Sequence, residues 1–283
     1  MSENIGANYH LRETKPDSTP KVKRAPKSGS IPTPFSYFSS DDGTDENLLI
    51  LLHGLGDTHV PFEILGRSLK LPQTAVLALR ATEQIPYLYE DAYQWYESWD
   101  ALGELIDRPN PTPALDLLTK VLDHLTKDLE WPLDRIHLFG FAQGGSVAAE
   151  YAMRKWKEQL QAHRSAIAAS EGASSSAGAP LTSLGSVVTV SGPLLSYPNP
   201  SSPSPTPILV VYRPSPSEEA LPSNAVAAFK KGFSSVTEVK LSAQRSGMPG
   251  SRDEMEPIMQ FWSEKLSRRR MEGLYEVMSG MSG

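Results

Sequence analysis

The chain contains no cysteine among its 283 residues. Thiol catalysis, disulfide bonds and cysteine-rich zinc sites are therefore excluded. No apolar run reaches the length of a membrane-spanning helix, and residues 1–5 lack the basic start and apolar stretch of a secretory signal. We expect a cytoplasmic protein, with a nuclear one as the alternative, and no integral membrane association.

Positive charge is also scarce. Lysine and arginine number 27 against 33 aspartates and glutamates, which gives a net charge of −6 and argues against a nucleic-acid partner. No cluster of His, Asp and Glu has metal-ligand spacing. The run Gly54-Leu55-Gly56 lacks the Gly-Lys-Ser/Thr continuation of a phosphate-binding loop. We therefore expect no metal and no cofactor.

Short apolar runs alternate along the chain with helical patterns. The clearest run, residues 48–52, is Leu-Leu-Ile-Leu-Leu, apolar on both faces as in the middle of a parallel sheet. Further strands are expected at residues 34–38, 75–79, 136–139, 187–190, 208–212 and 237–241. Helical patterns, such as residues 114–129, lie between them. This alternation predicts an α/β fold with a mostly parallel central sheet flanked by helices.

We expect a single domain over residues 31–270. Residues 1–30 are polar, proline-bearing and locally basic, which is typical of a disordered tail; a localisation signal or a contact with an anionic surface is the alternative interpretation. Residues 162–186 are rich in Ala, Ser and Gly without a hydrophobic period, which indicates a disordered surface insertion. Residues 271–283 are expected to form a flexible C-terminal end.

The most informative segment is Gly140-Phe141-Ala142-Gln143-Gly144. It has the glycine spacing of a nucleophile elbow, G-x-S-x-G, with alanine where the serine belongs. A strand-like run precedes it and a helical run follows it, which is the context that this motif requires. The two glycines allow a sharp turn and a close approach of strand and helix.

A second glycine motif, H-G-L-G-D at residues 53–57, follows the first buried strand. An aromatic segment around Trp95 lies between the two motifs. Over residues 45–155 the chain resembles the carboxylesterase/acyl-protein thioesterase family. This resemblance implies an α/β-hydrolase fold and a substrate class of acyl esters or thioesters, including lipidated proteins.

The resemblance also assigns residues to a site. The loop after the first strand and the residue after the nucleophile supply the amides of the oxyanion hole in this fold, which here are Leu55 and Gln143. Gly54, Gly56 and Trp95 would complete the loop and the pocket. Of the aromatic side chains in the neighbourhood, about half are expected in the core and the rest at an apolar pocket mouth; they are Tyr87, Tyr89, Tyr93, Trp95, Tyr96 and Trp99.

All three positions of the catalytic triad depart from the family pattern. Ala142 stands at the nucleophile position. The acid is expected near Ser215, where the run Arg-Pro-Ser-Pro-Ser contains no carboxylate, and the base is expected near Pro249. No histidine follows residue 163, and the only aspartate after residue 142 is Asp253, which suits the first turn of a helix.

Two functions follow from this pattern. The favoured one is a pseudo-hydrolase, catalytically impaired but retaining a pocket for an acyl group or a protein partner. The alternative is an active ester or thioester hydrolase, for example in protein depalmitoylation, with an unrecognised nucleophile. Ser146 is expected to face the helix–sheet packing, and His59 would lack an acceptor alcohol. Without a triad, an oxyanion hole and binding retain roughly 10³–10⁴-fold acceleration, well below the ~10⁶-fold of ordinary enzymes.

Overall fold

The computed structural model describes residues 9–12, 21–86, 91–170, 180–199, 201–268 and 276–279. Its centre is a seven-stranded sheet in the order β10-β9-β8-β7-β3-β4-β2. Every neighbouring pair is parallel except the edge pair β2–β4. The strands are β2 (Phe35–Phe38), β3 (Asn47–Leu52), β4 (Thr74–Leu79), β7 (Ile136–Phe141), β8 (Ser186–Val190), β9 (Ile208–Tyr212) and β10 (Val236–Lys240). The predicted mostly parallel sheet is confirmed.

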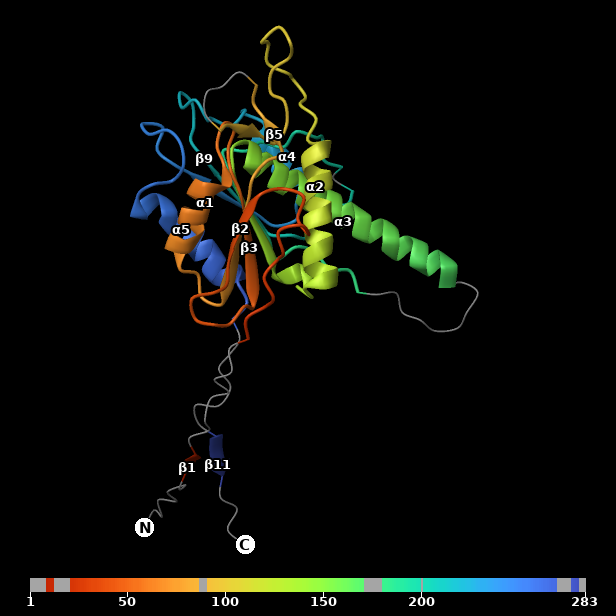
Figure 1. The fold of residues 1–283 in the computed structure, drawn as a ribbon, viewed down its shortest axis with the longest axis vertical. Coiled ribbons are helices and arrows are strands. Elements are labelled where there is room, and N and C mark those ends of the chain that lie inside the picture. The colour runs from red at the N-terminus through yellow and green to blue at the C-terminus, as the bar shows by residue number, and fades with distance from the viewer. Residues whose placement is uncertain are drawn as a thin grey trace, which may run out of the picture.

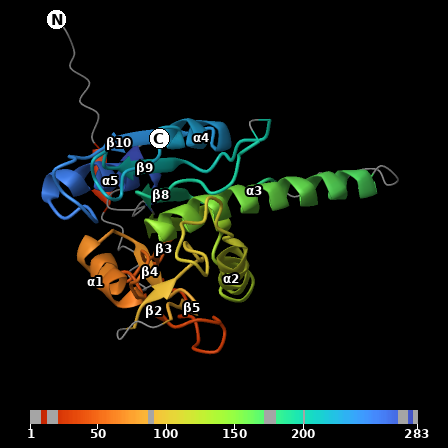
Figure 2. The same cartoon turned by 90° about the horizontal axis from the view of Figure 1, so that it is seen from above.

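Helices cover both faces of this sheet (Figures 1 and 2). On one face lie α1 (His59–Leu69) and α5 (Arg252–Lys265); on the other lie α2 (Thr112–Asp123), α3 (Gln143–Ser170) and α4 (Ala225–Gly232). Successive residues of a strand point to opposite faces. In β3, Leu48, Ile50 and Leu52 therefore join one core cluster, while Leu49 and Leu51 join the other. This double burial explains why the strand is apolar throughout.

Residues 21–30 are ordered against the domain. The Lys23 amide donates to the Asp45 carboxylate at 2.8 Å, and the Lys23 ammonium donates to the Glu130 carbonyl at 2.9 Å. Arg24 donates to the Asp128 carbonyl at 2.8 Å. Asp128 ends a π-helical turn, His124–Asp128, that continues α2, and cations are favourable at helix C-termini. The expectation of a disordered tail is therefore wrong for residues 21–30.

The two outer segments pair with each other. β1 (Tyr9–Arg12) and β11 (Glu276–Ser279) form a two-stranded antiparallel sheet. Strand β11 falls within the C-terminal end that was expected to be flexible. The remainder of residues 1–20 and of residues 269–283 lies outside the described part of the chain.

Helix α3 is 28 residues long and continues to Ser170. Residues 162–170, the start of the expected disordered insertion, are therefore helical, which corrects that prediction. Alanine is the strongest helix former, so the Ala-rich composition extends the helix even without a hydrophobic period. Residues 171–179 lie outside the described ranges. The far half of α3 projects past the sheet (Figure 1).

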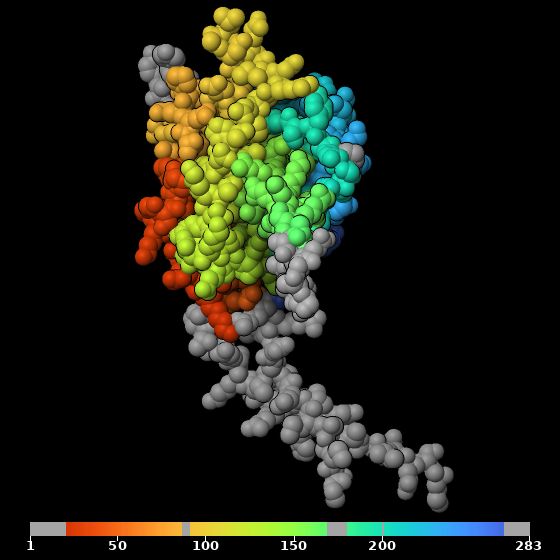
Figure 3. All heavy atoms as spheres, turned by 90° about the vertical axis from the view of Figure 1, so that its right-hand side faces the viewer, coloured from red at the N-terminus to blue at the C-terminus, as the bar shows by residue number. Residues whose placement is uncertain are grey.

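The connection between β4 and α2 is long and carries local structure. It contains a small antiparallel pair, β5 (Glu83–Gln84) with β6 (Tyr93–Gln94), and then a loop over residues 97–108. This loop, yellow in Figures 1 and 3, projects from the top of the molecule. A 3₁₀ turn, Leu133–Arg135, leads into β7. Within the described ranges, no helix combines the length and apolarity needed to cross a membrane.

Candidate active site

The turn between β7 and α3 has the geometry of an elbow. Ala142 lies between the strand and the helix with φ 47°, a left-handed conformation that costs an L-residue about 1–2 kcal/mol. The Ala142 amide donates to the Val190 carbonyl at 2.8 Å, and the Ser146 amide donates to the Ala142 carbonyl at 3.0 Å. Ser146 is fully buried, as expected for a residue in the helix–sheet packing. The chain therefore keeps a strained turn although the residue at its tip is alanine.

The glycines of the motif allow this turn to close. A Cβ added to Gly140 would lie 2.2 Å from the Gly144 carbonyl carbon. A Cβ on Gly144 would lie 2.3 Å from the Leu52 carbonyl oxygen and 2.5 Å from that of His53. Side chains at either position would thus collide with backbone. The elbow consequently sits directly against the end of β3, where the loop of residues 53–57 begins.

Gln143 joins the elbow to the aromatic segment. Its side-chain oxygen accepts from the Trp95 amide at 2.9 Å, and its side-chain nitrogen donates to the Tyr96 carbonyl at 2.9 Å and to the Ser98 hydroxyl at 2.8 Å. Only 5% of Gln143 is exposed. The sequence predicts a role for the backbone amide of Gln143 but not for its side chain, because glutamine carries no local signal for such hydrogen-bond partners.

Trp95 completes the same junction. Its indole donates to the His53 carbonyl at 2.8 Å, and the side chain is buried. Tyr93 and Tyr96 are buried as well, so these three aromatic side chains belong to the core. Trp99 is exposed, while Tyr87 and Tyr89 lie outside the described residues.

His53 shapes the loop and is not placed for proton transfer. Its Nε2 accepts from the Ala81 amide at 2.9 Å, so Nδ1 carries the proton and donates to the Gly54 carbonyl at 2.6 Å. Burial lowers the pKa of His53 to about 4. Leu55 and Gly56 follow on the more accessible part of the loop, and the Gly56 amide donates to the Tyr93 carbonyl at 2.9 Å.

A buried ion pair joins the loop expected to carry the acid to α5, the helix that follows the segment expected to carry the base. Arg213, directly after β9, is 1% exposed. Its guanidinium donates to the Glu254 carboxylate at 2.8 Å, to the Ser242 carbonyl at 2.9 Å and to the Gly247 carbonyl at 3.3 Å. The hydrogen bond from Arg213 lowers the pKa of Glu254 to about 2. Ser215 is exposed nearby.

A second contact ties these loops together. The Glu219 carboxylate accepts from the Gly247 amide at 2.9 Å and from the Ser217 hydroxyl at 2.8 Å. Pro249, which lies between Gly247 and α5 along the chain, is buried. The loop after β9 is thus fixed to the segment before α5. The ion pair is not predictable from the local sequence: an arginine directly after an apolar strand is the available signal, but its partner lies 41 residues further on.

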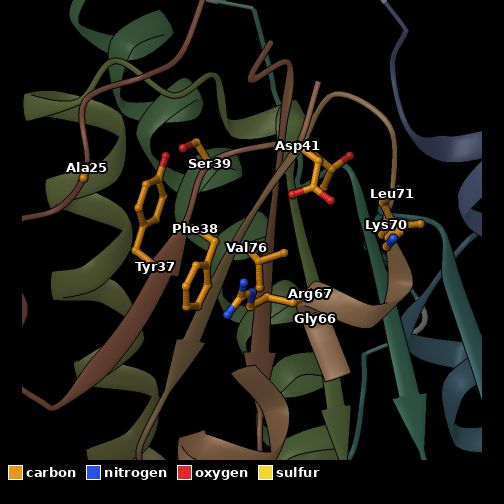
Figure 4. A pocket seen from close by; sticks show the side chains of 11 residues that line it. Ala25, Tyr37, Phe38, Ser39, Asp41, Gly66, Arg67, Lys70, Leu71 and Val76 are labelled. Atoms are coloured by element: carbon orange, nitrogen blue, oxygen red, sulfur yellow. The ribbon is translucent and has the colours of Figure 1, made fainter. Parts of the chain in front are cut away.

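A pocket of about 360 Å³ lies at the end of the sheet where β4 begins, away from the elbow (Figure 4). It is lined by the edge strand β2, the end of α1 and the start of β4, and the Arg67 guanidinium lies 4.8 Å from the centre of the Phe38 ring. Its lining includes neither Ala142 nor Gln143. Because β4 begins here whereas the elbow follows the end of β7, this hollow is separate from the candidate active site.

The mostly parallel sheet, with a strained strand–turn–helix elbow packed against the loop after β3, defines an α/β-hydrolase. The chain belongs to the phospholipase/carboxylesterase family, whose sequence model matches residues 37–178. It is 36% identical over 243 residues to an uncharacterized hydrolase from Mycosarcoma maydis, an alignment covering 84% of this chain and 83% of that protein. The family resemblance drawn from the two glycine motifs is confirmed.

Solved structures give the same fold. Esterase PE8 superposes with a TM-score of 0.61 at 16% identity, covering 83% of this chain and 98% of that one. Acyl-protein thioesterase 2 of Zea mays superposes with a TM-score of 0.57 at 18% identity, covering 83% and 100%.

Proposed function

We propose that this chain is a catalytically impaired member of its family, a pseudo-hydrolase that binds an acyl ester or thioester, including one carried by a lipidated protein. The observation that carries the proposal is Ala142 at the tip of an intact elbow. A serine-type hydrolase needs a hydroxyl there to form its covalent intermediate, and a methyl group cannot attack a carbonyl carbon.

The neighbouring loops supply no proton relay. An arginine is always protonated in a protein, so Arg213 cannot act as a base. The Glu254 carboxylate already accepts hydrogen bonds from Arg213 at 2.8 Å and from the Gly250 amide at 3.1 Å. Neither Ser215 nor Pro249 has a carboxylate or an imidazole that could accept a proton near neutral pH. These residues support loss of the whole triad and not of its serine alone.

Retention of the backbone frame supports a binding function. The left-handed backbone at Ala142 turns the chain sharply into α3 and would present the amide of residue 143 to a ligand. The Gln143 side chain holds the adjacent segment. With Leu55, that amide would donate hydrogen bonds to the carbonyl oxygen of a bound acyl group. Hydrogen bonds of this kind act on a ground-state carbonyl as well as on a transition state.

Hydrolysis of a short p-nitrophenyl ester and of an acyl thioester tests the loss of turnover. We expect the native protein and Ala142→Ser to lack turnover at ordinary enzyme rates, and a fluorophosphonate probe to label neither efficiently, since no base activates the new serine. The triple variant Ala142→Ser/Ser215→Asp/Pro249→His, which places a serine, an acid and a base at the three expected triad positions, is the positive control. Native turnover at enzyme rates would contradict the proposal and favour the alternative, an active hydrolase with another nucleophile.

Binding is measured separately from turnover. Titration calorimetry with a long-chain N-acyl amide, which hydrolyses too slowly to interfere, is expected to show saturable heat with the native protein. Absence of both binding and turnover would contradict an acyl-binding function and leave only the scaffold of the family.

A further inference from the structure

The 97–108 loop is a closed and ordered protrusion. The Asp100 carboxylate accepts from the amides of Leu102 and Glu104, both at 2.9 Å. Trp99 and Leu105 form an antiparallel bridge, and the Ile106 amide donates to the Ser98 carbonyl at 2.9 Å. These bonds hold the loop as a short hairpin that stands out from the body (Figure 3).

Its tip exposes large apolar side chains. Leu102 is 85% exposed, Leu105 75% and Trp99 45%. Beside them Tyr197, 79% exposed, is joined to the loop by Arg108, whose guanidinium lies 4.9 Å from the ring centre. Of the nine large apolar side chains exposed in the described part of the chain, four therefore gather here. A group of large exposed apolar side chains is typical of an interaction site.

The same loop is acidic. Glu97, Asp100, Glu104 and Asp107 are all exposed, whereas its single cation, Arg108, is engaged with Tyr197. Four carboxylates against one guanidinium oppose contact with an anionic lipid surface, and they oppose contact with the same loop of a second copy. Charge complementarity favours a partner that brings lysine or arginine together with apolar side chains.

We infer that the 97–108 loop is a docking surface for a basic, apolar segment of another protein. The partner's apolar side chains would cover Leu102, Leu105 and Trp99, and its cations would meet the surrounding carboxylates. At the base of the loop Ser98 accepts a hydrogen bond from Gln143, so the partner would bind beside the elbow. The inference is independent of the proposed function, because it depends on the surface of the loop and not on chemistry at Ala142.

The probe is a labelled amphipathic peptide built from leucine and lysine, with a leucine–glutamate peptide of equal length for comparison. Fluorescence anisotropy of the full chain is expected to show saturable, salt-sensitive binding of the Leu/Lys peptide only. The tryptophan emission should shift to shorter wavelength on binding, because Trp99 leaves water, and Trp99→Phe should abolish that shift.

Two loop variants and one matched control decide the location. Leu102→Ser/Leu105→Ser is expected to weaken peptide binding at least about tenfold, since two exposed leucines lose their burial. Glu97→Gln/Glu104→Gln should weaken it at low salt and flatten its salt dependence. Ile64→Ser, which removes an apolar side chain that is 65% exposed on α1, should leave binding unchanged. Circular dichroism checks that each variant is folded.

Three outcomes would overturn the inference. They are equal binding of the Leu/Glu peptide, binding by both loop variants at the native affinity, and loss of binding in Ile64→Ser alone. Binding of phosphatidylserine vesicles that the leucine variants abolish, without binding of the peptide, would assign the loop to a membrane surface instead. Each of these results is distinct from the esterase assay, which reports on Ala142.

Discussion

Replacing Glu254 with glutamine should destabilise the fold strongly. The Arg213 guanidinium is 1% exposed and the Glu254 side chain 10%, so the substitution leaves a buried positive charge without its counter-charge. Removing one partner of a buried ion pair costs about 3–5 kcal/mol. Domains of this kind have unfolding free energies of roughly 5–15 kcal/mol, so the expected loss is a large fraction of the total.

Urea denaturation followed by circular dichroism measures this loss as a change in the free energy of unfolding. Glu264→Gln is the matched control, because Glu264 lies on the same helix, is 57% exposed and pairs with the neighbouring Lys265. Its expected effect is within about 0.5 kcal/mol, as for most surface substitutions.

The double variant Arg213→Met/Glu254→Leu tests whether the loss in Glu254→Gln comes from the unpaired buried charge of Arg213. Replacing both charges by apolar groups of similar size is often near neutral, so the double variant should be more stable than Glu254→Gln alone. A loss below about 1 kcal/mol in Glu254→Gln would refute a stabilising role of the ion pair. A double variant whose loss equals the sum of the losses of Arg213→Met and Glu254→Leu would refute it as well.

Two further predictions concern the elbow and the histidines. Ala142→Gly should stabilise the protein by up to about 1 kcal/mol, since glycine removes the ~1–2 kcal/mol cost of left-handed backbone but loses ~0.5–1 kcal/mol of chain entropy. The control Ala227→Gly, at an exposed position within α4, should destabilise the protein by about 1 kcal/mol. Equal losses of stability for both variants in thermal melts would contradict this prediction. Burial lowers the pKa of His53 to about 4 and that of His137 to about 3 from 6.5, so their neutral forms stabilise the fold fully above pH 6.5, and this stability is lost as pH falls through the folded-state pKa values. The unfolding free energy should therefore decrease from pH 6.5 to pH 4 at constant ionic strength, with a smaller slope in His137→Asn; an unchanged slope would contradict the assignment.

Much of the fold could be predicted because its signals are local. The expected strands at residues 48–52 and 208–212 match β3 and β9 within one residue. The elbow and the loop after β3 follow from glycine spacing, which fixes close backbone approach wherever it occurs. Asp253 lies in the first turn of α5, as the helix dipole favours.

The features that escaped prediction depend on contacts between distant residues. Nothing in the sequence around Arg213 identifies Glu254 as its partner, and the Gln143 clamp joins positions 45 to 48 residues apart. Residues 21–30 look like a tail because their ordering comes from Asp45 and from the end of the helix near Glu130. In α3, intrinsic alanine propensity continued the helix where the absence of a hydrophobic period suggested disorder.

The arrangement of the chain ends has a practical consequence for surface-based biosensing. Ser267, after α5, donates to Asn47 at the start of β3, and Lys21 bridges to Thr44 just before that strand. Both ends of the described domain thus lie at the end of the sheet where β3 begins, whereas Ala142 lies at the opposite end, where the parallel strands finish. A protein tethered to a sensor chip through a tag at either end should present the elbow and the 97–108 loop to the flowing analyte.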